Sequence, residues 1–199
     1  PWVQGVLEQA WAPAPQTALE GYLQPLGGGV ADAEHVRALS ARAAVALGFS
    51  DASFAFEFRV SGQRDARLIR AAACPPCAES LGRLFELATG LDPLRAAIAH
   101  LTGVPESDPG HEPPPAEGFA VAYAAAPGPG TVRRAPAAPE LTALAAETGC
   151  REIHALVANV ETVEAGRRVA CALAADPAGS RSAYARARAA LAQVRVEVE

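Results

Sequence analysis

The chain has 199 residues, of which 50% are hydrophobic, and it carries a formal net charge of -5 at pH 7. This length supports one sizeable core, and the apolar content is too high for general disorder. The negative charge argues against general nucleic-acid binding, which requires a basic surface, and no apolar run approaches the roughly 18 residues that would span a membrane.

The start of the chain, residues 1–4, lacks the basic and then apolar pattern of a signal peptide. We therefore expect a cytoplasmic protein. All 17 basic residues are arginine and methionine is absent. This composition indicates a GC-rich bacterial coding sequence and a trimmed or incomplete chain.

The first third of the chain predicts helices around one clear pair of strands. Residues 2–10 and 16–23 are expected to form two short helices, and residues 32–47 a longer one with apolar side chains at helical spacing. Residues 54–60 alternate phenylalanine or valine with other residues, which is typical of a strand. Residues 66–71 return after a tight turn and complete a hairpin.

Helices follow this first hairpin. Residues 77–89 have a helical pattern, and Asp92-Pro93 opens another helix that ends at His100 or Leu101. Residues 103–117 form a proline-rich loop.

The remaining residues repeat the order of a helix followed by two strands. The expected strands are 119–123, 131–135, 153–163, 169–174 and 194–198, and the expected helices are 139–148 and 177–191. Alanine is so frequent between residues 153 and 174 that helix remains an alternative there.

These elements define an α+β fold class built from repeated helix–hairpin units. Hairpins linked by helices are expected to form an antiparallel sheet with the helices on one face. If the sheet curls, it becomes a partial barrel ringed by helices, with a pocket inside. We expect a single domain over residues 1–199, with an N-terminal helical segment at 1–30 and the proline-rich loop at 103–117.

Charged residues on the first hairpin are the first candidates for a functional site. Glu57, Arg59 and Arg70 are expected on the sheet face away from the helices. On an open sheet this is simply the solvated face. In a curled sheet it lines the interior, where Glu57 accepts a proton and the arginines hold a diphosphate through bidentate hydrogen bonds.

Arginine also occurs on the return strands of the later hairpins, at Arg133, Arg134 and Arg168. An anion-binding barrel would need this arrangement, and a chain whose only basic residue is arginine would also produce it by chance. Both interpretations stay open.

The hairpin patterns resemble a known family. Residues 53–60 and 65–70, followed by Pro75, and the later stretches 118–123 and 131–134 resemble the ABBA-type aromatic prenyltransferases, in particular their bacterial indole-prenylating, dimethylallyltryptophan synthase-like branch. The resemblance implies a barrel of antiparallel strands ringed by helices. It also implies a biosynthetic transferase of secondary metabolism that moves a prenyl group from an allylic diphosphate to an aromatic small molecule, without metal or cofactor.

The same resemblance implies roles for individual residues. Glu57 would be the base that takes the acceptor's proton, Arg67 or Arg70 would hold the allylic diphosphate, and Tyr123 would shield the cation. The chain has no Asp-Asp-x-x-Asp motif, which agrees with a metal-independent enzyme. The remaining substrate-binding candidates are Arg59, Arg133, Arg134 and Arg168.

The sequence Cys74-Pro-Pro-Cys77 supports a different hypothesis. A Cys-x-x-Cys motif at the start of a helix lowers the thiol pKa, because helix N-terminal amides stabilise the thiolate. A thiol-redox protein is therefore one alternative, and zinc binding with Cys150 or Cys171 is another. Structural thiols are the plainest interpretation. None of the four histidines has metal-ligand spacing with another histidine.

A non-catalytic α+β partner or binding subunit is the competing class of protein. The exposed sheet face would then be its contact surface, with either a protein partner or a second copy of the chain. Neither nucleic acid nor membrane is expected as a partner.

Overall fold

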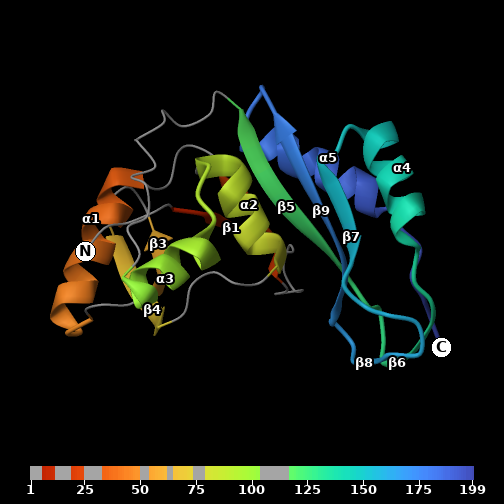
Figure 1. The fold of residues 1–199 in the computed structure, drawn as a ribbon, viewed down its shortest axis with the longest axis horizontal. Coiled ribbons are helices and arrows are strands. Elements are labelled where there is room, and N and C mark those ends of the chain that lie inside the picture. Colours follow the sequence, from red (N-terminus) through yellow and green to blue (C-terminus); the bar gives the residue numbers. More distant parts are fainter. Residues whose placement is uncertain are drawn as a thin grey trace. The chain divides into compact units, whose positions relative to one another are not determined.

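The computed structural model describes residues 6–11, 19–24, 33–49, 54–61, 65–73, 79–103 and 117–199. Contacts divide the chain into two compact units, which are described in turn. The first unit comprises Pro1–Leu7 and Leu26–Pro115, and the second comprises Glu8–Pro25 and Ala116–Glu199. The second unit is therefore built from two separate pieces of the chain, coloured red and green to blue (Figure 1).

The described part of the first unit holds three helices and one hairpin. The elements are α1 (Ala33–Ala46), β3 (Ala55–Ser61), β4 (Asp65–Ala72), α2 (Glu79–Thr89) and α3 (Pro93–Thr102). The antiparallel pair β3–β4 confirms the hairpin expected from the alternating phenylalanines. Two of these phenylalanine rings contact Phe49, which follows α1. The Phe49 ring stacks on the Phe54 ring, with centroids 4.3 Å apart, and its centroid lies 6.0 Å from that of Phe56.

The ends of α3 follow from local sequence. The Asp92 carboxylate accepts hydrogen bonds from the backbone N–H groups of Leu94 and Arg95, and Pro93 occupies the first turn. These contacts satisfy donors that have no partner within the helix. Gly103 ends the helix with a φ of 67°, a conformation that glycine adopts at little cost.

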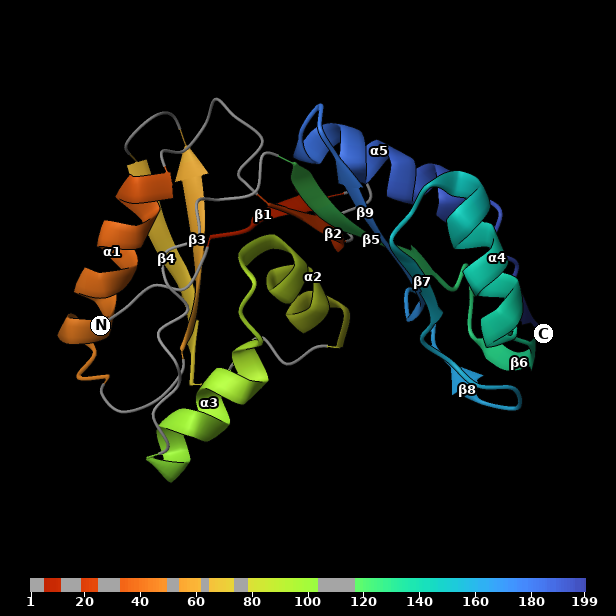
Figure 2. The same ribbon diagram turned by 45° about the horizontal axis from the view of Figure 1, so that its top comes forward.

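Over its described residues, the second unit has two antiparallel sheets and two helices. Its elements are β1 (Glu8–Trp11), β2 (Leu19–Gln24), β5 (Gly118–Ala125), β6 (Gly130–Arg134), α4 (Ala138–Thr148), β7 (Glu152–Ala155), β8 (Thr162–Val163), β9 (Arg168–Asp176), α5 (Ser180–Leu191) and β10 (Glu197–Val198). The larger sheet has the order β1-β2-β5-β9-β7, and the smaller has the order β10-β6-β8. Figure 2 shows β1 and β2 beside β5.

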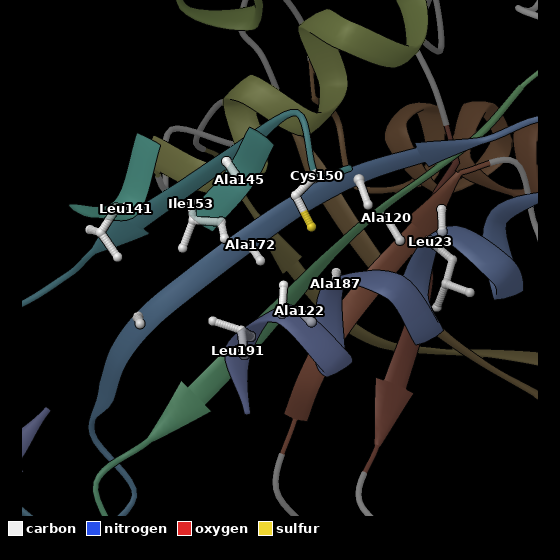
Figure 3. Packing of buried hydrophobic residues seen from close by; sticks show 14 residues of the cluster. Leu23, Ala120, Ala122, Leu141, Ala145, Cys150, Ile153, Ala172, Ala187 and Leu191 are labelled. Atoms are coloured by element: carbon white, nitrogen blue, oxygen red, sulfur yellow. The ribbon is translucent and has the colours of Figure 1, made fainter. Parts of the chain in front are cut away.

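Alanine dominates the core between the larger sheet and its helices. The alternate residues Ala120, Ala122, Ala172 and Ala174 belong to one buried cluster with Ala183, Ala187 and Ala190 of α5 (Figure 3). Small side chains let helix and sheet backbones approach closely. A second cluster of Ala126, Val132, Val157, Val163 and Val169 lies around the smaller sheet.

The start of the chain differs from the prediction. Two short helices were expected at residues 2–10 and 16–23, but strands β1 and β2 are found where the structure describes these stretches, and residues 2–5 and 16–18 lie outside the described residues. Gly21 and Leu23 are buried, and residues 21–24 pair with β5. This long-range pairing overrides the local helical pattern.

The later hairpins also differ from the prediction. β5 pairs along one edge with β2 and along the other with β9, so neither edge is left for β6. β6 pairs instead with β8 and β10. The strand expected at 153–163 divides into β7 and β8, which belong to different sheets. The partners of these strands depend on contacts far apart in the sequence, which the local pattern did not indicate.

The α+β class with antiparallel sheets is confirmed, but the barrel is wrong. Over the described residues, the strands form separate sheets of five, three and two strands, and β1 and β7 lie at opposite edges of the largest. A barrel requires those edges to pair. No helix in the described ranges has the length and apolar character needed to cross a bilayer. The single domain over residues 1–199 stays a prediction, and residues 104–116 of the proline-rich loop lie outside the described residues.

Candidate functional site

The charged residues of the first hairpin lie on one face of an open sheet. Glu57 pairs with Arg70 and Arg59 with Arg67 in the β3–β4 register, which shifts between Glu57 and Phe58. Residues that are directly opposite each other in an antiparallel pair point to the same side. Arg59 and Arg70 are exposed, and the Arg67 side chain is 80% exposed with Asp65 at 3.9 Å. This is the solvated face that an open sheet presents.

The predicted cysteine motif cannot be placed, because Cys74 and Cys77 lie outside the described residues. The other two cysteines, Cys150 and Cys171, are buried. Within the described ranges, no three His, Cys, Asp or Glu side chains form a group that could hold a metal ion.

Arg133 and Arg134 lie on β6 in the smaller sheet, where both form surface ion pairs. Arg133 contacts Glu199, and Arg134 contacts Glu140 at 3.3 Å. The side chains of all four residues are more than half exposed. Arg168, in contrast, belongs to the larger sheet and contacts a different partner.

Tyr123 and Arg168 do come together. The Arg168 guanidinium carbon lies 4.0 Å from the centroid of the Tyr123 ring, a cation–π contact. Tyr22 approaches the same ring edge-on, with centroids 6.3 Å apart and an interplanar angle of 87°. Three strands thus contribute to one cluster: β2, β5 and β9.

A β-bulge makes this contact possible. Tyr123 pairs with Cys171, and in a regular strand Arg168 would point away from Cys171, because side chains three residues apart lie on opposite faces. The register shifts between Ala124 and Ala125, so that Ala125 pairs with Arg168. The shift lets Arg168 lie over Tyr123 on the face away from α4 and α5.

The same face carries a second polar pair at the sheet edge. Cys171 of β9 is paired with His154 of β7 on one side and with Tyr123 of β5 on the other, so His154 and Tyr123 point to the same face of the sheet. Their strands are two positions apart in the sheet, a separation of about 10 Å. Its Nε2 lies 3.0 Å from Glu152 Oε2. We call Tyr22, Tyr123, Arg168, His154 and Glu152 the Tyr–Arg face. Sequence reasoning identified only Tyr123 and Arg168, and did not place Tyr22, Glu152 or His154 in a strand face.

Two groups with shifted pKa values lie around α5, and sequence reasoning missed both. Burial, followed by the charge of Glu20, raises the pKa of the Tyr184 hydroxyl to about 12. Hydrogen bonds from the Ala178 N–H and the Ser182 hydroxyl lower the pKa of Asp176, and Arg186 acts in the same direction. Both groups join α5 to neighbouring segments. Tyr184 of α5 donates a hydrogen bond to Glu20 of β2, and Asp176 at the end of β9 accepts one from Ser182 of α5.

No protein-family model and no curated protein matches the sequence. Solved structures do match its fold. Phosphoribosylglycinamide synthetase from Anaerococcus prevotii has a TM-score of 0.68 at 10% identity, over 97% of this chain and 49% of its own. L-amino acid ligase from Bacillus licheniformis has a TM-score of 0.67 at 13% identity, over 94% and 46%.

A third match is the biotin carboxylase domain of 2-oxoglutarate carboxylase from Hydrogenobacter thermophilus. Its TM-score is 0.67 at 15% identity, over 98% of this chain and 42% of its own. The chain therefore spans less than half the length of these neighbours, which are ATP-grasp enzymes. At these identities the likeness concerns the fold alone.

The fold comparison overturns the prenyltransferase interpretation. The neighbours are ATP-grasp ligases and carboxylases, so the predicted family, the prenyl transfer and the allylic diphosphate and aromatic partners are wrong. Neither a non-catalytic partner nor a thiol-redox protein is supported. The hairpin pattern did not identify the family, because alternating phenylalanines followed by an arginine-bearing return strand specify a hairpin and not the sheet to which it belongs.

Proposed function

We propose that this chain forms part of an ATP-dependent ligase or carboxylase of the ATP-grasp class and works in the cytoplasm. The observation that carries the proposal is the likeness to a synthetase, a ligase and a carboxylase over 94–98% of the chain, at TM-scores of 0.67–0.68. Fold alone does not define a reaction, so the residues have to be tested against the chemistry.

A magnesium-bound nucleotide is the first group to test. The Hydrogenobacter structure is a complex with MgADP and bicarbonate. Magnesium prefers several oxygen ligands in octahedral geometry. In the part of the chain that the structure describes, no group of three acidic or other metal-binding side chains exists. On the hairpin, Glu57 is opposite Arg70, and Asp65 lies near Arg67. Nucleotide-bound magnesium needs only one or two protein carboxylates besides the phosphate oxygens, so the roles assigned below concern the acid substrate alone.

The Tyr–Arg face fits the other substrate of a ligation better. Carboxylate and bicarbonate anions are bound well by a guanidinium, whose planar fork donates two parallel hydrogen bonds. The Tyr123 ring, whose centroid lies 4.0 Å from the guanidinium carbon of Arg168, restrains the position of that fork. Tyr22 in turn supports the Tyr123 ring from its edge. We assign Arg168 the role of holding the acid substrate and Tyr123 the role of positioning Arg168.

The test measures ADP formation from ATP, and binding of ADP, by the complete enzyme of which this chain is proposed to form part, with bicarbonate or single amino acids as the acid. Acid-dependent ADP formation is expected for at least one of them. Arg168→Gln should raise the KM for that acid roughly 10- to 100-fold with a small effect on kcat, the usual worth of hydrogen bonds to a charged group. Arg195→Gln, which removes an exposed arginine near the chain end, is the matched control.

Two results would contradict the proposal. If no acid stimulates ADP formation and ADP shows no saturable binding, ATP-dependent ligation is excluded. If Arg168→Gln and Arg195→Gln have the same KM, the acid does not bind at the Tyr–Arg face.

A further inference from the structure

Exposed apolar side chains are concentrated in the first unit, away from the Tyr–Arg face. Over the described residues, nine large hydrophobic side chains are exposed, and seven of them belong to this unit. They lie around the end of α1, on β4 and on α3: Val45, Leu47, Leu68, Ile69, Leu94, Ile98 and Leu101. Single exposed apolar side chains are ordinary, whereas a concentration of them marks a contact surface.

The three side chains on α3 form a continuous stripe. Leu94, Ile98 and Leu101 are spaced by four and then three residues, which places them on one face of the helix. Their exposed fractions are 52%, 52% and 78%. Pro93 and Ala96 of the same helix are buried. We call Leu94, Ile98 and Leu101 the α3 stripe.

The composition of α3 is that of an internal helix. A helix at a protein surface normally presents charged and polar residues to water. Between residues 93 and 102, Arg95 is the only Asp, Glu, Lys or Arg, and no carboxylate interrupts the stripe. A helix that is apolar on all sides is typically buried in a larger structure. The described residues of this chain cover one face of α3 and leave the stripe open.

The fold comparison indicates what covers the stripe. The three solved structures match 94–98% of this chain but only 42–49% of their own length. More than half of each of those folds therefore lies outside the matching region. If this chain forms part of an ATP-grasp enzyme, the complete enzyme contains a further portion at least as large as this chain.

We propose that the α3 stripe is the surface on which this remaining portion of the enzyme docks. The inference rests on the proposed function and adds the place where the two portions meet. Because the stripe is purely aliphatic, the docking surface is expected to present aliphatic or aromatic side chains, as the buried centre of an interface does. The contact is the same whether the remaining portion continues this polypeptide or is a separate subunit.

The test is carbene footprinting, read by residue-resolved mass spectrometry, of the 199-residue chain alone and of the complete enzyme. Labelling of the α3 stripe should be roughly 5-fold lower or more in the complete enzyme, because interface centres pack as densely as protein interiors. Val160, an 83% exposed apolar side chain of the second unit, is the internal reference. Protection of the stripe without equal protection of Val160 supports the inference.

A charge at the centre of the stripe provides an independent measurement. In the complete enzyme, Ile98→Arg would bury an unpaired guanidinium in the contact, so labelling of Leu94 and Leu101 should return to the level of the chain alone. Ala189→Arg places the same side chain at an exposed position of α5 and should leave the protection unchanged. Circular dichroism of both variants in the chain alone should show the melting curve of the parent, since both positions are exposed there.

Several results would overturn the inference. Equal labelling of the stripe in the two proteins would leave it uncovered, and equal protection of Val160 would make the shielding general. Protection already present in the chain alone would assign the stripe to the second unit, or to a second copy if it grows with concentration. A native protein without polypeptide beyond residues 1–199 would also exclude the contact.

These outcomes are separate from those of the ADP assay. Acid-dependent ADP formation by an enzyme with an unprotected stripe leaves the ligation intact and rejects the docking surface. A protected stripe in a protein that forms no ADP leaves the contact in place and rejects the ligation.

Discussion

Gly21 lies where β2 meets both β5 and α5. A Cβ added there would clash with the Val121 carbonyl oxygen and lie 2.7 Å from the Tyr184 ring. Since a sheet backbone cannot move aside cheaply, we expect Gly21→Ala to destabilise the protein by roughly 1–3 kcal/mol. The urea-unfolding midpoint measures this loss. At Gly128 an added Cβ meets nothing within 4 Å, so Gly128→Ala should stay within about 0.5 kcal/mol of the parent. Equal effects of the two substitutions would contradict the close packing at Gly21.

Tyr184 should make stability depend on alkaline pH. Its pKa in the folded protein is about 12, above the ordinary value of 10.0, because burial and then Glu20 disfavour the phenolate. The folded state therefore favours the neutral hydroxyl. This contribution is fully present below pH 10 and is lost as the pH rises towards 12. Thermal unfolding between pH 8 and pH 12 should show the parent losing stability faster than Tyr184→Phe above pH 10. A constant difference between the two proteins across this range would contradict the shift.

At the scale of elements, the packing of α5 depends on alanine at the positions that face the sheet. Ala187 is fully buried in the cluster with Leu23 and Ala122 (Figure 3), whereas Ala189 on the same helix is exposed. A larger side chain at Ala187 has no space, and we expect Ala187→Leu to cost roughly 1–3 kcal/mol. Ala189→Leu adds the same side-chain atoms to the same helix at an exposed position, so its effect on stability should be close to zero. Chemical denaturation of the two variants provides the comparison, and similar losses would mean that α5 does not pack on the sheet through Ala187.

Elements whose cause is local could be predicted from the sequence. The Asp92-Pro93 start of α3 and the β3–β4 hairpin with its alternating phenylalanines agree with the structure. The partners of β5 and β6 could not be predicted, because β5 has both edges taken by strands that lie far away in the sequence. The sequence of β2 has no alternation of apolar and polar residues, and its spacing predicted a helix instead. Its identity depends on pairing with β5.

The candidate site shows the same division. Tyr123 and Arg168 were identified individually from their residue types, which suit anion binding. Their contact depends on the bulge between Ala124 and Ala125, a feature that no local pattern revealed. Tyr22 joined the cluster only because residues 19–24 form a strand. Residue chemistry was therefore readable from sequence, but the grouping of residues required the sheet order.

At the scale of the whole molecule, the second unit is discontinuous. Residues 8–25 supply β1 and β2, and residues 116–199 supply the rest. Leu23 is only 3% exposed and belongs to the core with α5. Arg181 contacts Glu8 at 3.2 Å, and Arg188 contacts Glu20 at the same distance. The N-terminal strands therefore complete this unit from far away in the sequence.

This arrangement predicts the behaviour of fragments. A fragment of residues 116–199 leaves the β5 edge unpaired and the Leu23 site in its core empty, so it should unfold at a lower temperature than when a peptide of residues 8–25 is present. Because the peptide binds only the folded fragment, the midpoint should rise with peptide concentration. Circular dichroism measures the midpoint, and a peptide with Leu23→Asp should have no effect, since it would bury an unpaired carboxylate. An unchanged midpoint with the parent peptide would mean that residues 116–199 fold without the N-terminal strands.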